Sequence, residues 1–124
     1  MGPRRAAWLA AATLLLATAA PAQASPAAGD YEAQLCVALA EQPASCGPAQ
    51  ARLGRTGLRL QVSDIVYRLQ LHSSQLDVTL MHGTMQIDGF TADYDWQGNT
   101  LRFADIGKRA RYEVQLGTRQ SATK

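Results

Sequence analysis

Apolar and polar residues alternate over most of the second half of the chain, and this period constrains the fold more than any other feature. The alternation begins at Leu58, Leu60 and Val62 and recurs as far as Leu116. Successive side chains of a β-strand point to opposite faces, so a period of two indicates strands with one buried face. Gly, Ser, Asn and Asp separate the short runs, which is typical of hairpins. The pattern predicts a bent antiparallel meander of about six strands.

The expected turns agree on one apolar face. A two-residue turn at residues 98–99 pairs Trp96 with Leu101 and Tyr94 with Phe103 on the buried side. The same reasoning places further turns at residues 73–74, 82–83 and 106–107. A slip of one residue would reverse every side chain, so this agreement supports the register. A sheet of this kind can curl toward a half-barrel.

The alternation changes phase at two places. At Asp88 and Gly89 we expect a β-bulge that bends a long strand. At residues 63–64 a hairpin would place Arg59 opposite Arg68 and would lack glycine. Like charges opposite each other destabilise a strand pair. A bulge or a loose corner is therefore favoured over a hairpin at residues 63–64.

The segment before the alternating region has features of a helix. Asp30 can cap a helix over residues 31–42, and Pro43 would end it. One helical face carries Tyr31, Leu35, Ala38 and Leu39. The sequence thus predicts an α+β domain over residues 30–124, in which a short N-terminal helix packs on the meander.

Two cysteines, Cys36 and Cys46, lie ten residues apart. A C-x-x-C redox motif is absent, so a structural disulfide is expected. This bond would fasten the last turns of the predicted helix to the connector that begins at Gly47 and Pro48. A loop of this length stabilises a fold by about 2–3 kcal/mol in the chain-entropy model.

Residues 1–24 have the pattern of a secretory signal peptide. Arg4 and Arg5 precede an uncharged, mostly apolar run, and an A-x-A site ends at Ala24. This run stops at Pro21, which is short for a membrane-spanning helix. We predict cleavage before Ser25, a short linker over residues 25–29 and a periplasmic or secreted product, and the excess of Arg over Lys favours a GC-rich bacterial source.

Charge limits the classes of partner. Removal of residues 1–24 takes away Arg4 and Arg5 and leaves ten basic and ten acidic residues. A neutral domain lacks the field that drives non-specific binding to phosphate backbones or anionic membranes. Nucleic acid is therefore not an expected partner, and no membrane span is expected in the mature chain.

The residues that could suggest catalysis or metal binding are better explained by core packing and surface charge. Met81, His82, Met85 and His72 are copper-ligand types, but the predicted turn at residues 82–83 points Met85 into the core and Met81 outward. Asp93 and Asp95 share an outward face, where Asp95 pairs with Arg102 as in ordinary charge alternation. The sequence predicts no enzyme, no metal site and no cofactor.

The expected function is that of a small exported binding or accessory protein, such as an inhibitor or immunity-type partner of another protein. We expect the last strand to be a free edge, guarded by Arg109, Arg111 and Glu113, to which a partner strand could pair. The alternative is a periplasmic carrier of a lipid or another apolar small molecule. Its ligand would lie on an apolar face that includes Tyr94, Trp96 and Phe103.

Overall fold

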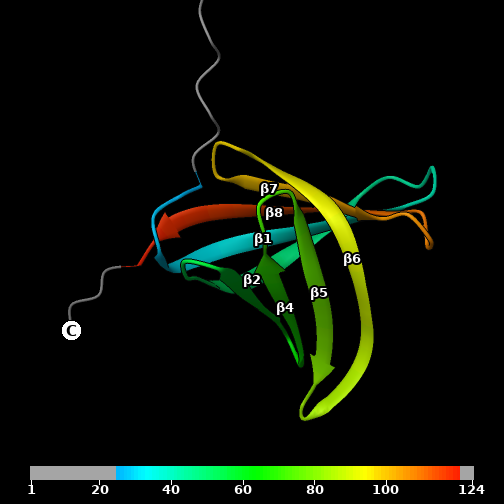
Figure 1. The fold of residues 1–124 in the computed structure, drawn as a ribbon, viewed down its shortest axis with the longest axis horizontal. Coiled ribbons are helices and arrows are strands. Elements are labelled where there is room, and N and C mark those ends of the chain that lie inside the picture. The colour runs from blue at the N-terminus through cyan, green and yellow to red at the C-terminus, as the bar shows by residue number, and fades with distance from the viewer. Residues whose placement is uncertain (1–24, 121–124) are drawn as a thin grey trace, which may run out of the picture.

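The protein folds as a closed barrel of eight antiparallel strands (Figure 1). The computed structural model describes residues 25–120, and the predicted signal peptide at residues 1–24 lies outside that range. The strands are β1 (Gly29–Leu39), β2 (Ser45–Leu53), β3 (Gly57–Val62), β4 (Ile65–Leu71), β5 (Gln75–His82), β6 (Met85–Gln97), β7 (Thr100–Asp105) and β8 (Ala110–Arg119). Each strand pairs with the next, and β8 pairs with β1 to close the ring. The α+β prediction is wrong, because the described chain is all-β and contains no helix.

The helix predicted over residues 31–42 is absent: residues 31–39 belong to strand β1, and residues 40–42 lie in the turn that follows it. The apolar residues of this strand fit a period of two as well as a helical stripe, because Tyr31, Leu35 and Leu39 are four residues apart. The strand conformation prevails because β1 has a partner on each side, β2 and β8. Pairing with β8 joins the two ends of the domain, and no local pattern reports such a contact.

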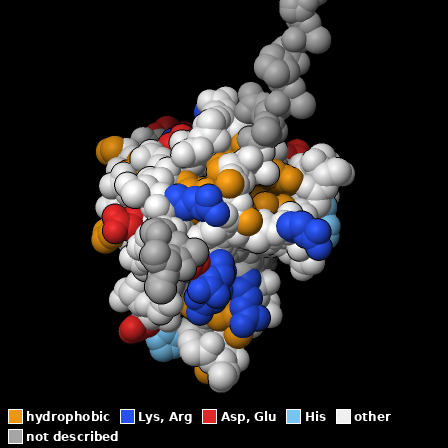
Figure 2. Space-filling model, turned by 90° about the vertical axis from the view of Figure 1, so that its left-hand side faces the viewer, with side chains coloured by type: hydrophobic (Ala, Val, Ile, Leu, Met, Phe, Trp, Pro, Cys, Tyr) orange, Lys and Arg blue, Asp and Glu red, His pale blue; other side chains and the backbone are white. Residues whose placement is uncertain are grey.

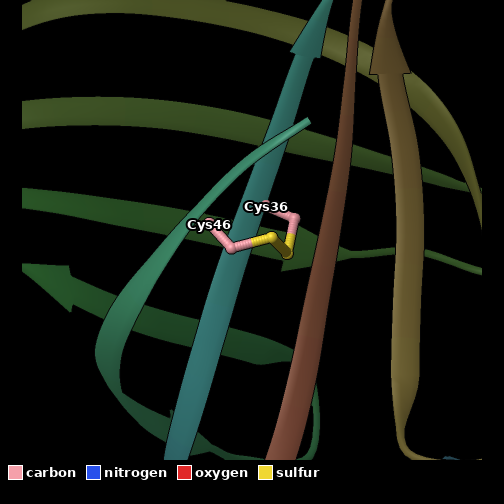
Figure 3. Close-up of a disulfide and its surroundings, with 2 residues drawn as sticks. All are labelled: Cys36 and Cys46. Carbon is pink, nitrogen blue, oxygen red and sulfur yellow. A yellow bond between two sulfur atoms is a disulfide. The ribbon is translucent and has the colours of Figure 1, made fainter. Parts of the chain in front are cut away.

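The predicted disulfide between Cys36 and Cys46 is confirmed. The two residues are directly paired on β1 and β2, with Cα atoms 4.0 Å apart (Figure 3). The bond therefore links adjacent strands of a hairpin instead of fastening a helix to a connector. A disulfide is compatible with an oxidising, exported location.

The barrel interior is filled with side chains. Leu60, Leu76, Leu101 and Val114 come from four different strands, and each has 0% exposure. An eight-stranded barrel is about wide enough for its inward side chains to fill it. The meander predicted from sequence therefore closes around its own core.

Two ladders in the barrel wall are short. β2 pairs with β3 only through residues 50–53, and β6 pairs with β7 only through residues 94–97. Pro48, which has no amide hydrogen, lies in the part of β2 that pairs only with β1. Figure 1 shows that β4 and β5 consequently run in a different direction from β1 and β8, while β6 curves between the two directions.

The turns at residues 73–74 and 98–99 have the predicted registers, with Leu71 opposite Leu76 and Tyr94 opposite Phe103. The turn after β7 is longer than expected and covers residues 106–109. It pairs Phe103 with Tyr112, two residues beyond the expected position.

The β3–β4 connection is a hairpin, which corrects the expectation of a bulge or loose corner. Ser63 adopts the left-handed conformation, with φ of 55°, that glycine usually provides. Arg59 therefore lies directly opposite Arg68 despite the like charges.

The β5–β6 register also differs from the prediction. His82 pairs with Met85, so the turn lies one residue later than expected, at Gly83, whose φ is 62°. The ladder then shifts between Leu80 and Met81, which leaves Ile87 without a partner. The irregularity lies just before the predicted position at Asp88, and Met85 is 65% exposed instead of packed in the core.

Candidate functional site

Exposed apolar side chains lie at one end of the strands, which we call the open end. This end is defined by four turns: β1–β2, β3–β4, β5–β6 and β7–β8. The large hydrophobic residues exposed in residues 25–120 are Leu39 (55%), Met85 (65%), Ile87 (49%) and Ile106 (86%). All of them lie in or beside turns at this end. The β1–β2 and β7–β8 turns lie side by side and the β5–β6 turn lies apart from them, so Leu39 and Ile106 form one exposed apolar group and Met85 and Ile87 another (Figure 1). Exposed apolar groups of this kind can mark surfaces that bind partners or ligands.

An aromatic cluster lies behind the open end. The rings of Phe103 and Tyr112 stack with their centroids 4.9 Å apart, and Phe90 lies 5.7 Å from Tyr112. Tyr67 meets Tyr112 edge-on at 6.4 Å. The rings come from β4, β6, β7 and β8, so the cluster joins the two diverging parts of the barrel wall.

A charged bridge formed by Lys108, Asp88 and Asp105 lies near Tyr112 of the aromatic cluster. Lys108, in the β7–β8 turn, donates to the carboxylate of Asp88 on β6, and its Nζ lies 3.9 Å from Oδ2 of Asp105. The Gly89 amide also donates to Asp88 Oδ1 at 2.8 Å. These bonds, that from Lys108 first, lower the pKa of Asp88, and the bond to Asp88 raises the pKa of Lys108.

Tyr112 lies within this environment and is 9% exposed. Burial raises the pKa of the Tyr112 phenol to about 12, with smaller contributions from Tyr67, Asp105 and Asp88. Burial also raises the pKa of Tyr67. Both phenols are therefore neutral in the physiological pH range.

A groove of about 470 Å³ follows the line where β6 separates from β7. It brings together four residues that the sequence assigned to two separate sites: Tyr94 and Phe103 of the apolar face, and Arg111 and Glu113 of the partner edge. Trp96 does not line this groove. It is 5% exposed and packs in the core near the opposite end.

The strand carrying the predicted partner edge has no free side, because β8 pairs with β7 and with β1. Arg109 forms an ion pair with Glu41 at 2.9 Å, and Arg111 donates to the Ala40 carbonyl at 3.1 Å. These contacts join the β1–β2 and β7–β8 turns. A partner could meet these outward side chains, but it could not extend the sheet at β8.

The other polar candidates are engaged on the outer surface. Asp95 pairs with Arg102 at 3.3 Å, and Asp93 accepts a bond from Gln75 at 3.3 Å. Across residues 25–120 no group of three or more His, Cys, Asp or Glu residues is placed to hold a metal ion.

His72 is 3.0 Å from Asp77, but the Thr91 hydroxyl donates to Asp77 and not to the imidazole. These two bonds, that from Thr91 first, lower the pKa of Asp77. The arrangement lacks the bond from nucleophile to base that hydroxyl activation requires.

Sequence reasoning missed the bridge of Asp88, Lys108 and Asp105. One signal was available, since Asp88 continues the inward phase of Phe90 and Ala92 and is therefore an acid on the apolar face. Lys108 is in a turn, and its partner on β6 depends on how the barrel closes.

The described part of the chain defines a small all-β barrel with one open, apolar end. Among residues 25–120 we find no helix with the length and apolarity needed to cross a membrane. Comparison with known proteins adds no relative: no protein-family model, curated protein or solved structure matches the chain.

Proposed function

We propose that the protein is an exported, non-enzymatic binding protein that engages another protein through the open end of its barrel. The exposure of Leu39, Met85, Ile87 and Ile106 at that one end carries the proposal. Exposing such side chains to water costs free energy that a partner surface would recover by burying them, at about 25 cal/mol per Å² of apolar area. An inhibitor or an immunity-type protein would act in this way, by covering a surface of its target.

A protein partner fits this end better than an enclosed apolar ligand does. The centre of the barrel is occupied by fully buried side chains such as Leu60 and Leu101. The exposed apolar residues lie on separate turns, and the adjacent groove also carries charges of both signs, including Asp95, Arg102 and Glu113. Protein interfaces combine an apolar centre with a polar rim in the same manner. A lipid or other apolar carrier function remains the alternative outcome.

Export to the periplasm or the extracellular medium is part of the proposal. The disulfide between Cys36 and Cys46 supports it, as does the signal-peptide pattern of residues 1–24. Intact-mass measurement of the exported protein is expected to give a chain that starts at Ser25. A mass that retains Arg4 would contradict cleavage at this site.

The binding proposal can be tested by native mass spectrometry of the protein purified from its own cell envelope or culture medium. We expect a protein complex that is weakened at least tenfold in the double variant Met85→Ser with Ile106→Ser. The matched control, Ser73→Ala with Asn99→Ser, changes exposed residues in turns at the opposite end and should bind as the wild type does. A co-purified lipid would favour the carrier alternative, and equal partner binding by both variants would exclude the open end.

A further inference from the structure

Three arginines lie in one row across the outer face of the barrel. Arg52 on β2 is directly opposite Arg59 on β3, and Arg59 is directly opposite Arg68 on β4. Adjacent strands are about 4.8 Å apart, so the three Cα atoms span about 10 Å. Arg55, in the turn between β2 and β3, lies beside the same row. We call Arg52, Arg59 and Arg68 the arginine row.

Acidic groups neutralise little of the arginine row. Arg52 pairs with Asp30 at 2.8 Å, at one end of the row. Among residues 25–120, Arg59 and Arg68 form no ion pair. Asp77 borders the row but is already bonded to Thr91 and His72. Figure 2 shows basic side chains on one face of the molecule, two of them lying side by side.

This arrangement opposes folding. Like charges at directly opposed positions destabilise a strand pair, and the β3–β4 hairpin places two such residues opposite each other without a glycine in its turn. Residues that break a local rule at the expense of stability are often found at functional sites. Arg59 and Arg68 have no ion-pair partner among residues 25–120, whereas Asp95 and Arg102 on the same outer surface show the alternating signs that serve solubility. The two unpaired arginines are therefore better explained by binding than by solubility.

The row borders a groove with a volume of about 540 Å³. Hydroxyl groups of Thr56 and Thr79 and the amide of Gln70 add neutral hydrogen-bond donors to its lining. Guanidinium groups donate in pairs to the oxygens of phosphate, sulfate or carboxylate groups. The groove thus offers several charged donors within the reach of one small anion.

We propose that this groove binds a small oxyanionic ligand that carries at least two phosphate or sulfate groups. Arg59 and Arg68 are the central contacts, and Arg52 and Arg55 contact the second group. A single carboxylate would leave most of the guanidinium donors unused, whereas two tetrahedral groups separated by one strand spacing would engage them. The site lies on β2, β3 and β4, and the proposal does not depend on the function of the open end.

Isothermal titration calorimetry with inorganic tripolyphosphate tests this proposal on the disulfide-bonded protein. We expect saturable binding by the wild type and at least a tenfold loss of affinity in Arg59→Gln with Arg68→Gln. The matched control, Arg102→Gln with Arg111→Gln, removes the same charge from β7 and β8 and should keep wild-type affinity. The Arg59 and Arg68 variant should also unfold at higher urea than the wild type in the absence of ligand, which shows that lost binding is not lost folding.

A second arm identifies the source of the phosphate. Cosedimentation with cardiolipin vesicles, whose headgroup carries two phosphates, but not with phosphatidylcholine vesicles, would indicate a lipid headgroup. Binding of tripolyphosphate without cosedimentation would indicate a soluble ligand, and either result supports the site. Absence of tripolyphosphate binding, equal affinity in the row variant and the wild type, or equally tight binding of a glutamate oligomer would overturn the proposal.

Discussion

Large apolar side chains are buried at one end of the barrel and exposed to solvent at the other. At the end formed by the turns of residues 54–56, 72–74 and 98–99, called here the sealed end, aromatic side chains are buried, with Tyr31 4% and Trp96 5% exposed. Their neighbour Tyr94, on β6, donates to the carbonyl of His72 in the β4–β5 turn. At the open end, Met85 and Ile106 are 65% and 86% exposed although they are as apolar as any core residue.

The difference follows from where the ladders run. The short β2–β3 and β6–β7 ladders both lie toward the sealed end, so the wall is continuous there and separates toward the open end. Packing at the sealed end stabilises the fold, and the open end is the surface through which we propose that the protein binds a partner. Proteins often place binding surfaces in regions of lower local stability.

The comparison is tested most strongly by removing one apolar side chain from each end. Trp96→Ala leaves a cavity in the packed sealed end and should lower the free energy of unfolding by about 3–5 kcal/mol. Ile106→Ser changes a solvated side chain at the open end and should alter it by less than about 0.5 kcal/mol. Urea unfolding measures the free energy of unfolding of both variants. It is followed by far-ultraviolet circular dichroism, because the loss of Trp96 would change a fluorescence signal. Similar losses in the two variants would mean that the open end belongs to the stability core.

The disulfide gives the next largest effect. Cys36→Ser with Cys46→Ser should lower the free energy of unfolding by about 2–3 kcal/mol, because the unfolded chain gains the entropy of an open loop. The bond links the β1–β2 hairpin, whose turn contributes Leu39 to the open end. Hydrogen exchange should therefore increase first at residues 40–44. An equal increase in hydrogen exchange at both ends would show that the disulfide stabilises the whole barrel and not the open end in particular.

Local sequence patterns predicted the parts of the fold that depend on neighbours in sequence. The turn at residues 98–99 and the pairing of Tyr94 with Phe103 follow from alternation and a glycine, and both are confirmed. Strand β1 was not predictable in this way, because its apolar spacing suits a helix and its decisive partner, β8, lies at the other end of the chain.

The candidate sites were less predictable for a similar reason. The β5–β6 turn lies one residue later than its residue types suggested, and this shift moves Met85 from the core to the surface. The repulsion between like charges favours a bulge over a hairpin that pairs Arg59 with Arg68, yet the structure contains this hairpin. Where an observed arrangement costs stability, local rules of stability predict a different structure.

The titration of Tyr112 distinguishes the two ends by pH. Burial beside the open end raises the pKa of this phenol to about 12, so the folded state favours the neutral form. The resulting stability is complete below the ordinary tyrosine pKa of about 10 and is lost as the pH rises toward 12. Ultraviolet titration should show one tyrosinate forming near pH 12 in the wild type and missing in Tyr112→Phe. An ordinary pKa would show that the aromatic cluster is open to water.

The smallest expected effect concerns the bridge between Lys108 and Asp88. The two side chains are 55% and 30% exposed, so solvent weakens the ion pair and Lys108→Met should lower the free energy of unfolding only slightly. The bridge nevertheless connects the β7–β8 turn to β6, across the line where the wall separates. Its loss should therefore change local opening more than global stability.

Hydrogen exchange at the Gly89 amide can resolve this local change, because that amide donates to Asp88 Oδ1. The lowered pKa of Asp88 means that the bridge stabilises the fold above the ordinary carboxyl pKa of about 4 and is lost as the pH falls through the lower, folded-state pKa. After correction for the intrinsic exchange rate, protection of Gly89 should fall with acidification in the wild type and already be low in Lys108→Met. The Leu116 amide, bonded to Asn99 at the sealed end, serves as the internal control and should keep its protection in both proteins. Parallel losses at Gly89 and Leu116 would show that acid loosens the whole barrel, and the two ends would then not open independently.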